Sequence, residues 1–177
     1  AIELLEELRP ARRVVGGVAR ERRRDLLAAV LERVARDDPD ERRVVGDGET
    51  TATLAVEAGA AAIKHAGLSP DDIDLLIVAT ATTEQLIPHT GAFVGDGLGI
   101  HCGSFDVNAG CAGFVYELVI GSSMLTAGNL DHVLVIGSET LSRVIDPHDR
   151  STCILFGDGA AGVVLSASPD DGPGVVS

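Results

Sequence analysis

The rest of the chain is organised around the stretch S-F-D-V-N-A-G-C-A-G-F-V-Y, which runs from Ser104 to Tyr116. Its first part, Phe105 to Asn108, has the apolar character of a short buried strand, and apolar residues then recur at helical spacing beyond Cys111. Cys111 is therefore expected at a strand-to-helix turn. Gly110 and Gly113 on either side of it allow the backbone to bend sharply and leave room for another group to approach the sulfur.

This position makes Cys111 a candidate nucleophile. The N–H groups of the first helical turn and the helix dipole would favour its thiolate, the form that attacks carbon. The alternative is a structural cysteine buried in the core, because free cysteine packs as a small hydrophobe. A redox sensor is a third hypothesis, although nothing in the sequence places Cys102 or Cys153 as its resolving partner.

The segment N-A-G-C-A-G-F-V-Y resembles the nucleophile segment of β-ketoacyl-acyl-carrier-protein synthase III, a thiolase-fold condensing enzyme. Three more stretches are similar to the same family in order and spacing. They are E-R-R-V-V-G-D-G-E-T-T from Glu41, D-L-L-I-V-A-T-A from Asp74 and D-R-S-T-C-I-L-F-G-D-G from Asp149. Together these matches extend over about residues 41 to 177.

The resemblance implies an α/β, thiolase-like fold, which in the family consists of two similar α-β-α halves. We expect this chain to hold the N-terminal half, with a mixed, mainly parallel sheet around a buried nucleophile helix. The hydrophobic pattern agrees with alternating helices and buried strands. The expected elements are a helix from Thr50 to about Gly67, a strand over Leu75 to Ala79, a helix from about His89 to Leu98, and strands over His132 to Gly137 and Ala160 to Ala167.

The chain divides into two parts. Residues 1–40 do not resemble the family and are rich in arginine, and an amphipathic pattern predicts a helix from Arg22 to Arg36. Residues 41–177 are the thiolase-like half. In the family, a histidine and an asparagine that assist the cysteine belong to the second half, so neither can be assigned to a residue of this chain.

The resemblance implies an acyltransferase of fatty acid biosynthesis. Cys111 would take an acyl group from acyl-CoA, and the carbanion from decarboxylated malonyl-acyl-carrier protein would attack that group. Coenzyme A enters as a thioester substrate, and no cofactor is expected. Two alternatives stay open: a non-catalytic truncated half or subunit of a split synthase, and a relative such as a polyketide starter-unit synthase or another acyltransferase.

Outside the nucleophile segment, the resemblance implies roles for individual residues. Arg150 matches an arginine that contacts the coenzyme A end of the substrate tunnel, and a salt bridge to Asp146 or Asp149 is its alternative role. The chain has no tryptophan, so the family's clamp on the adenine of coenzyme A is altered or missing.

The remaining carried-over positions concern the acyl chain. Ser151, Ile154 and Phe156 match residues that line the substrate tunnel, although the two apolar ones could equally be plain core. Ile87 matches the residue that reaches across the dimer interface and closes the acyl pocket of the partner. It is often larger in the family, so we expect this chain to accept branched or longer primers, and we expect a homodimer or a complementary second half as its partner.

Charge and cysteine content exclude other classes. Residues 1–43 carry 11 Arg against 10 acidic residues, whereas residues 44–177 carry 3 basic residues against 17 acidic ones. Such an acidic body argues against nucleic acid. The 3 cysteines form no zinc or C-x-x-C spacing, no metal site is implied, and a reducing cytoplasm fits best. We read no membrane span or signal peptide in the chain.

Overall fold

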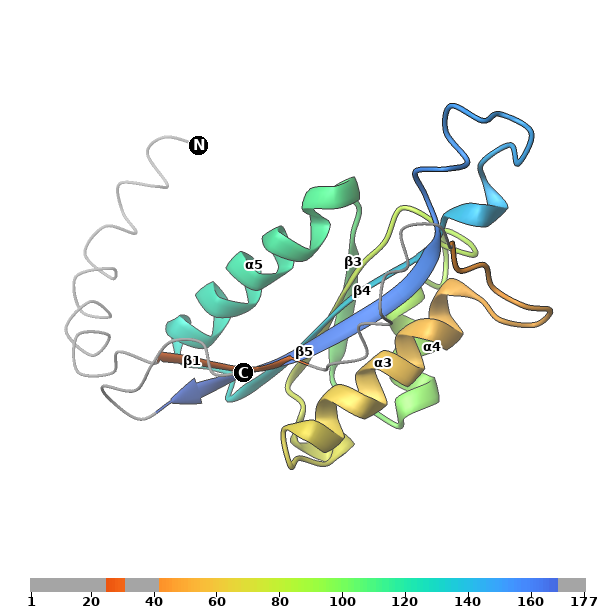
Figure 1. Ribbon diagram of the computed structural model, residues 1–177. Helices are drawn as coiled ribbons and strands as arrows, with labels where there is room; N and C mark the ends of the chain where they lie inside the picture. Colours follow the sequence, from red (N-terminus) through yellow and green to blue (C-terminus); the bar gives the residue numbers. More distant parts are fainter. Residues whose placement is uncertain (1–24, 31–41, 169–177) are drawn as a thin grey trace, which may run out of the picture.

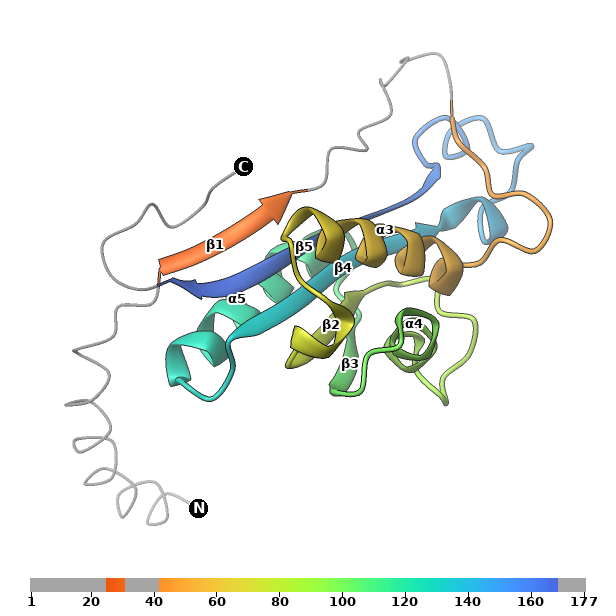
Figure 2. The same ribbon diagram turned by 90° about the horizontal axis from the view of Figure 1, so that it is seen from below.

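The computed structural model describes residues 25–30 and 42–168, which form a three-layer α-β-α unit (Figures 1 and 2). The central layer is a 5-stranded sheet in the order β1-β5-β4-β2-β3. Helices α3 and α4 cover one face of this sheet, and α5 covers the other. The bounds are β1 Asp25–Val30, α3 Thr51–His65, β2 Leu75–Ala79, α4 Thr90–Leu98, β3 Gly103–Val107, α5 Gly113–Ala127, β4 His132–Thr140 and β5 Asp158–Ser168.

The sheet is mixed, as the sequence predicts. Strand β2 runs parallel to both of its neighbours, β3 and β4, whereas β5 runs antiparallel to β4 and to β1. Every residue of β2 is buried, which suits a central strand covered on both faces. Because β2, β3 and β4 are parallel, their carboxyl ends lie at one edge of the sheet, and the loops that follow them gather there.

Two apolar clusters hold the layers together. One lies between the sheet and the helices α3 and α4, and the other lies between the sheet and α5. Aliphatic side chains dominate both clusters, so helices approach the sheet closely. The largest fully buried apolar side chains are Leu76, Ile77, Leu125, Leu134, Ile136 and Leu165.

The predicted helix over Arg22–Arg36 is wrong where the structure describes it. Asp25–Val30 forms strand β1, which pairs with β5 from Asp25 opposite Ser168 to Val30 opposite Val163. The edge of β5 offers a row of unpaired backbone groups, and pairing with it outweighs a local helical preference. The rest of the predicted Arg-rich helical segment lies outside the described residues.

Helix α5 is buried on one side only, which corrects the expectation of a buried nucleophile helix. Its inward row lies on the sheet, whereas an apolar row on the other side faces solvent. Among residues 25–30 and 42–168, Gly110–Ala127 is the one helical segment with the length and composition of a membrane span, and 22% of it is buried. The exposed apolar side chains are Val115, Tyr116, Val119 and Met124.

Candidate active site

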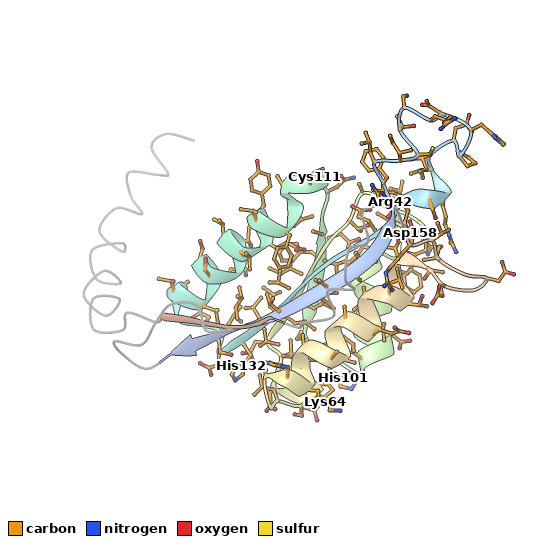
Figure 3. All side chains as sticks on the ribbon, in the orientation of Figure 1. Arg42, Lys64, His101, Cys111, His132 and Asp158 are labelled. Atoms are coloured by element: carbon orange, nitrogen blue, oxygen red, sulfur yellow. The ribbon has the colours of Figure 1, made fainter. Side chains whose placement is uncertain are left out.

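Cys111 lies at the strand-to-helix turn that the sequence predicts, just before the amino end of α5 (Figure 3). It occupies a short 3-10 turn, Gly110–Ala112, which separates the end of β3 from α5. Gly110 has φ +51°, a left-handed conformation that residues with a side chain rarely adopt. Cys111 is exposed, so the alternative of a buried structural cysteine is wrong. The turn therefore presents a free thiol at the edge where the parallel strands end.

Gly113 has a different role from the expected one. A Cβ atom at this position would lie 2.9 Å from the Cβ of Ala79 at the end of β2. Its lack of a side chain thus lets the first turn of α5 approach the sheet, and does not clear space around the sulfur. This close packing of α5 on the end of β2 sets how near the Cys111 turn lies to the sheet.

The loop 141–157 carries most of the predicted substrate residues at this same edge, close to the segment that begins at Arg42 (Figure 3). Arg150 and Ser151 are exposed, and the Ser151 hydroxyl donates to the Asp149 carboxylate at 2.6 Å. Hydrogen bonds from Ser151 hold the pKa of Asp149 below its ordinary value. The salt bridge considered for Arg150 does not form within the described part of the chain.

Ile154 and Phe156 are 56% and 36% exposed, so the alternative that they are core residues is wrong. Ile87 is 87% exposed in the loop 80–88, which follows β2. Each predicted substrate residue thus belongs to one of two loops at the carboxyl edge of the parallel strands. These loops leave their apolar side chains uncovered, and their roles in substrate binding stay predictions.

Asp158 was not found from the sequence, because it precedes the strand that was expected over Ala160 to Ala167, whereas in the structure β5 begins at Asp158. Its carboxylate accepts hydrogen bonds from the backbone N–H groups of Val45 and Ser142, each at 2.8 Å. Burial acts to raise the pKa of Asp158, but these bonds, the Ser142 hydroxyl and the charge of Arg143 outweigh it and lower the pKa. Asp158 thereby joins the 42–46 segment to the 141–157 loop.

We expect Asp158→Ala to lower the free energy of unfolding by about 2 kcal/mol at neutral pH, because it leaves two backbone donors without a partner. The depressed pKa adds a pH signature. The stability due to Asp158 is present at neutral pH and is lost as the pH falls through its folded-state pKa. Urea unfolding at several pH values tests this, with Asp47→Ala at an exposed acid as the matched control. Equal losses in the two variants, or a loss that persists unchanged in acid, would contradict the assignment.

Asp106 is a second residue that the sequence did not reveal. It lies on β3, and its carboxylate accepts the backbone N–H groups of Thr90 at 2.7 Å and Gly91 at 2.8 Å. These are the first N–H groups of α4, so Asp106 satisfies the amino end of a helix from a neighbouring strand. In the sequence, the one sign of such a role was an acidic residue between two apolar ones in the stretch F-D-V.

Glu117 is the most unusual ionisable group of the described residues. It lies on the row of α5 that faces the sheet, is 0% exposed, and neither carboxyl oxygen has a hydrogen-bond partner. Burial, with a smaller contribution from the charge of Asp106, raises the pKa of Glu117 to about 9. The carboxyl group is therefore neutral at pH 7. Its periodicity with Gly113, Gly121 and Leu125, four residues apart, was the signal in the sequence.

Two of the histidines, His101 and His132, lie far from the thiol (Figure 3). His132 starts β4, at the opposite end of the sheet from Cys111. The His132 ring is 2.8 Å from the Ser166 hydroxyl, and the His89 ring is 3.0 Å from that of Ser104. His148 stays in the exposed loop.

Metal chemistry has no support in the described ranges. Within residues 25–30 and 42–168, no group of three or more His, Cys, Asp or Glu side chains is placed to hold a metal ion. The three cysteines are free thiols. The geometry thus offers one exposed cysteine just before a helix, at the same edge of the sheet as two loops with exposed apolar side chains, which suits a nucleophile that forms a covalent intermediate.

Comparison with known proteins identifies relatives of this arrangement. The family model for 3-oxoacyl-[acyl-carrier-protein (ACP)] synthase III matches residues 105–177. A β-ketoacyl-[acyl-carrier-protein] synthase III from Rhizorhabdus wittichii is 51% identical over 137 residues, which are 77% of this chain and 43% of the relative. One from Sinorhizobium medicae is 49% identical over 133 residues, 75% of this chain and 41% of the relative. The chain thus spans less than half the length of these curated relatives.

Solved structures share the fold. The 3-oxoacyl-[acyl-carrier-protein] synthase III from Aquifex aeolicus VF5 matches with a TM-score of 0.71 and 43% identity, over 73% of this chain and 42% of that one. The priming β-ketosynthase of the R1128 polyketide biosynthetic pathway matches with a TM-score of 0.70 and 39% identity, over 75% and 40% of the two chains. The described α-β-α unit is therefore similar to part of these condensing enzymes.

Proposed function

Because this chain belongs, over about residues 41–177, to the 3-oxoacyl-[acyl-carrier-protein] synthase III family, we propose that it supplies the nucleophile half of such a condensing enzyme. The observation that carries the proposal is Cys111, an exposed free thiol between a parallel strand end and the start of α5. Cys111 lies within residues 105–177, which match the family model, and its exposed thiol is suited to act as a nucleophile.

The proposed first stage is acyl transfer to Cys111. Its sulfur attacks the carbonyl carbon of an acyl-CoA thioester, and the tetrahedral intermediate collapses as coenzyme A leaves as a thiol. Backbone N–H groups at the turn, including that of Cys111, are placed to receive the negative charge that develops on the carbonyl oxygen. The product of this stage is an acyl-Cys111 thioester.

The second stage is condensation. Malonyl-acyl-carrier protein loses carbon dioxide, the resulting enolate attacks the acyl carbonyl, and the Cys111 thiolate leaves as the β-ketoacyl product forms. The enolate needs hydrogen-bond donors to stabilise it. The histidine and asparagine that the family resemblance implies for this role belong to the other half, so turnover requires that half. No cofactor takes part in either stage.

The exposed row of α5 supports a complementary half as the partner. Its apolar side chains include Val115 and Val119, at 57% and 58% exposure, and Tyr116 at 54%. A contiguous apolar surface of this kind on a helix marks an interface. The relatives are more than twice as long as the matched region, so their remaining sequence is the natural candidate to cover it.

A homodimer is the second proposed assembly. Strand β3 is an edge strand, so one row of its backbone groups is free to pair with another strand. The loop 80–88 beside it exposes Leu86 and Ile87 almost completely. In a dimer, we propose that Ile87 enters the acyl pocket of the second copy, where its modest size leaves room for branched or longer primers.

A polyketide starter-unit synthase is the alternative function within the same chemistry. The similarity to the R1128 priming β-ketosynthase, at 39% identity, supports this alternative function. The two functions differ in the acyl-carrier protein that accepts the product. Comparing product formation with carrier proteins of fatty acid and polyketide synthesis would separate them.

The test is condensation by the chain alone and together with the complementary part of the Rhizorhabdus relative. We expect intact-protein mass spectrometry to show an acyl adduct after incubation with acetyl-, isobutyryl- or hexanoyl-CoA, and β-ketoacyl product only when the complementary part and malonyl-acyl-carrier protein are added. No adduct under either condition would overturn the enzymatic proposal and favour a non-catalytic half.

A further inference from the structure

Glu139 is a carboxylate on β4 that contacts the root of the loop 80–88. One carboxyl oxygen accepts the backbone N–H of Ala81 at 2.8 Å. The other accepts the hydroxyl of Thr82 at 2.5 Å, with the Thr80 hydroxyl at 3.4 Å. Hydrogen bonds to an ionised acceptor are stronger than those between neutral groups. Glu139 therefore fixes the first residues that follow β2.

Thr82 extends this anchor to two more elements. Its carbonyl accepts the hydroxyl of Thr51, the first residue of α3, at 2.7 Å. Its own hydroxyl accepts the backbone N–H of Thr140, at the end of β4, at 2.9 Å. The Thr51 and Thr140 hydroxyls are 2.8 Å apart, which closes the network. The loop root is thus held by β2, β4 and α3 at once.

Later in the loop the side chains are exposed, whereas its first residues are held by hydrogen bonds. Leu86 and Ile87 are 88% and 87% exposed, although a flexible loop would gain by folding such side chains onto the protein. Local hydrogen bonds within the loop, from the Thr83 hydroxyl to the Gln85 carbonyl at 2.9 Å and from the Gln85 amide to the Ile87 carbonyl at 3.0 Å, help to define its conformation. Leu86 and Ile87 are therefore exposed in a loop whose first residues are held in place, the arrangement of a preorganised contact.

We propose that Glu139 is the positioning residue that fixes the loop 80–88 and, through it, sets the depth at which Ile87 closes the acyl pocket of a second copy of this chain. The role of Ile87 rests on the proposed function. Glu139 itself lies at the base of the loop and need not touch substrate. If the hydrogen bonds of Glu139 are weakened, the loop moves more freely and Ile87 can be displaced by a long acyl chain. Glu139 therefore controls primer length through the loop.

The variant that tests this is Glu139→Gln, which keeps the shape of the side chain. Its amide oxygen can still accept the Ala81 N–H, but its amide nitrogen then faces the Thr82 oxygen, so the charge-assisted hydrogen bond that the Thr82 hydroxyl donates to Glu139 is lost and at most a weaker, neutral one replaces it. The matched control is Glu49→Gln. Glu49 also accepts a loop N–H, that of Gly46 at 2.7 Å, but has no hydrogen bond to the loop 80–88.

Two readouts are needed. Hydrogen–deuterium exchange of the full chain measures whether amides 81–87 lose protection, and we expect a loss of about tenfold in Glu139→Gln and none in the control. Cys111 acylation by acetyl-CoA and decanoyl-CoA measures selectivity, and we expect the ratio of the two rates to change by about tenfold. A residue that only stabilised the fold would slow both donors equally.

A double variant completes the test. If Glu139 acts through Ile87, Ile87→Ala changes the same ratio, and adding Glu139→Gln to it changes the ratio no further. Unchanged exchange of the loop in Glu139→Gln would overturn the proposal, as would an unchanged ratio in a parent chain that is acylated. If the parent takes no acyl group from any donor, the proposed function has failed, and the exchange result alone decides whether Glu139 positions the loop.

Discussion

Cys111→Ala is expected to abolish acyl transfer to the chain, with no adduct detectable by mass spectrometry where the parent gains one acyl group. The reason is that the thiol supplies the bonding electron pair, and no other nucleophile lies at this turn to replace it. Removal of a covalent nucleophile in enzymes of this kind lowers turnover by several orders of magnitude. The fold should persist, because Cys111 is exposed and its side chain fills no core space.

Two other cysteines serve as internal controls for this result. Cys102 is partly buried, and burial raises the pKa of its thiol, so little thiolate is available. Cys153 is partly buried in the 141–157 loop. We expect Cys102→Ala and Cys153→Ala to keep the adduct. An adduct that survives in Cys111→Ala, or that disappears in Cys153→Ala alone, would show that a residue other than Cys111 is acylated.

Glu117→Leu is expected to stabilise the protein, and to do so more as the pH rises. The folded-state pKa of Glu117, about 9, lies above its ordinary value of 4.5. The folded state therefore keeps a proton that the unfolded state releases between these values, and stability falls as pH rises through this window. The loss is about 1.4 kcal/mol per pH unit. It stops above pH 9, where the group is ionised in both states.

Leucine suits the site because the surroundings are apolar. Glu117 lies on the same α5 row as Leu125, over the cluster that contains Val133, Val135 and Leu165. Replacing an unpartnered polar group there by an apolar one of similar volume removes a desolvation cost. At pH 8 we expect a gain on the order of 3 kcal/mol in the free energy of unfolding.

Urea unfolding between pH 5.5 and 9 checks this expectation, with Glu117→Gln as the matched variant. Glutamine removes the titration but keeps a buried polar group without a partner, so its stability should be flat with pH and lower than that of Glu117→Leu. A parent and a Glu117→Leu variant whose stabilities run parallel with pH would show that this carboxyl group does not titrate in the folded state as described.

The position of Cys111 in the fold was predicted from short, local signals. The N-A-G-C-A-G-F motif placed Cys111 between a strand and a helix because turn glycines and helical periodicity are encoded within a dozen residues. Buried strands β2 and β4 were equally clear, since a run such as L-L-I-V-A has no other stable place than a covered sheet. These predictions depended on neighbours in the sequence, and the structure confirms them.

Burial of an ionisable group was not predicted from the sequence. Glu117 had the periodicity of the inward row of α5, but only the packing of that row on the sheet shows that both of its oxygens lack a partner. The strand at Asp25–Val30 was missed for a similar reason. Its conformation depends on the free edge of β5, more than 130 residues later in the chain.

The order of the helices and strands from α3 onward, the place of Cys111 and the family could all be read from the amino-acid sequence, because they depend on local patterns. Which polar groups join the loops at the carboxyl ends of the strands could be seen only in the folded structure. Asp158 bonds to Val45, 113 residues away, and Glu139 bonds to Ala81, 58 residues away. Such pairs have no local signature, because folding brings the ends of different strands to one edge and only there do the donors and acceptors meet.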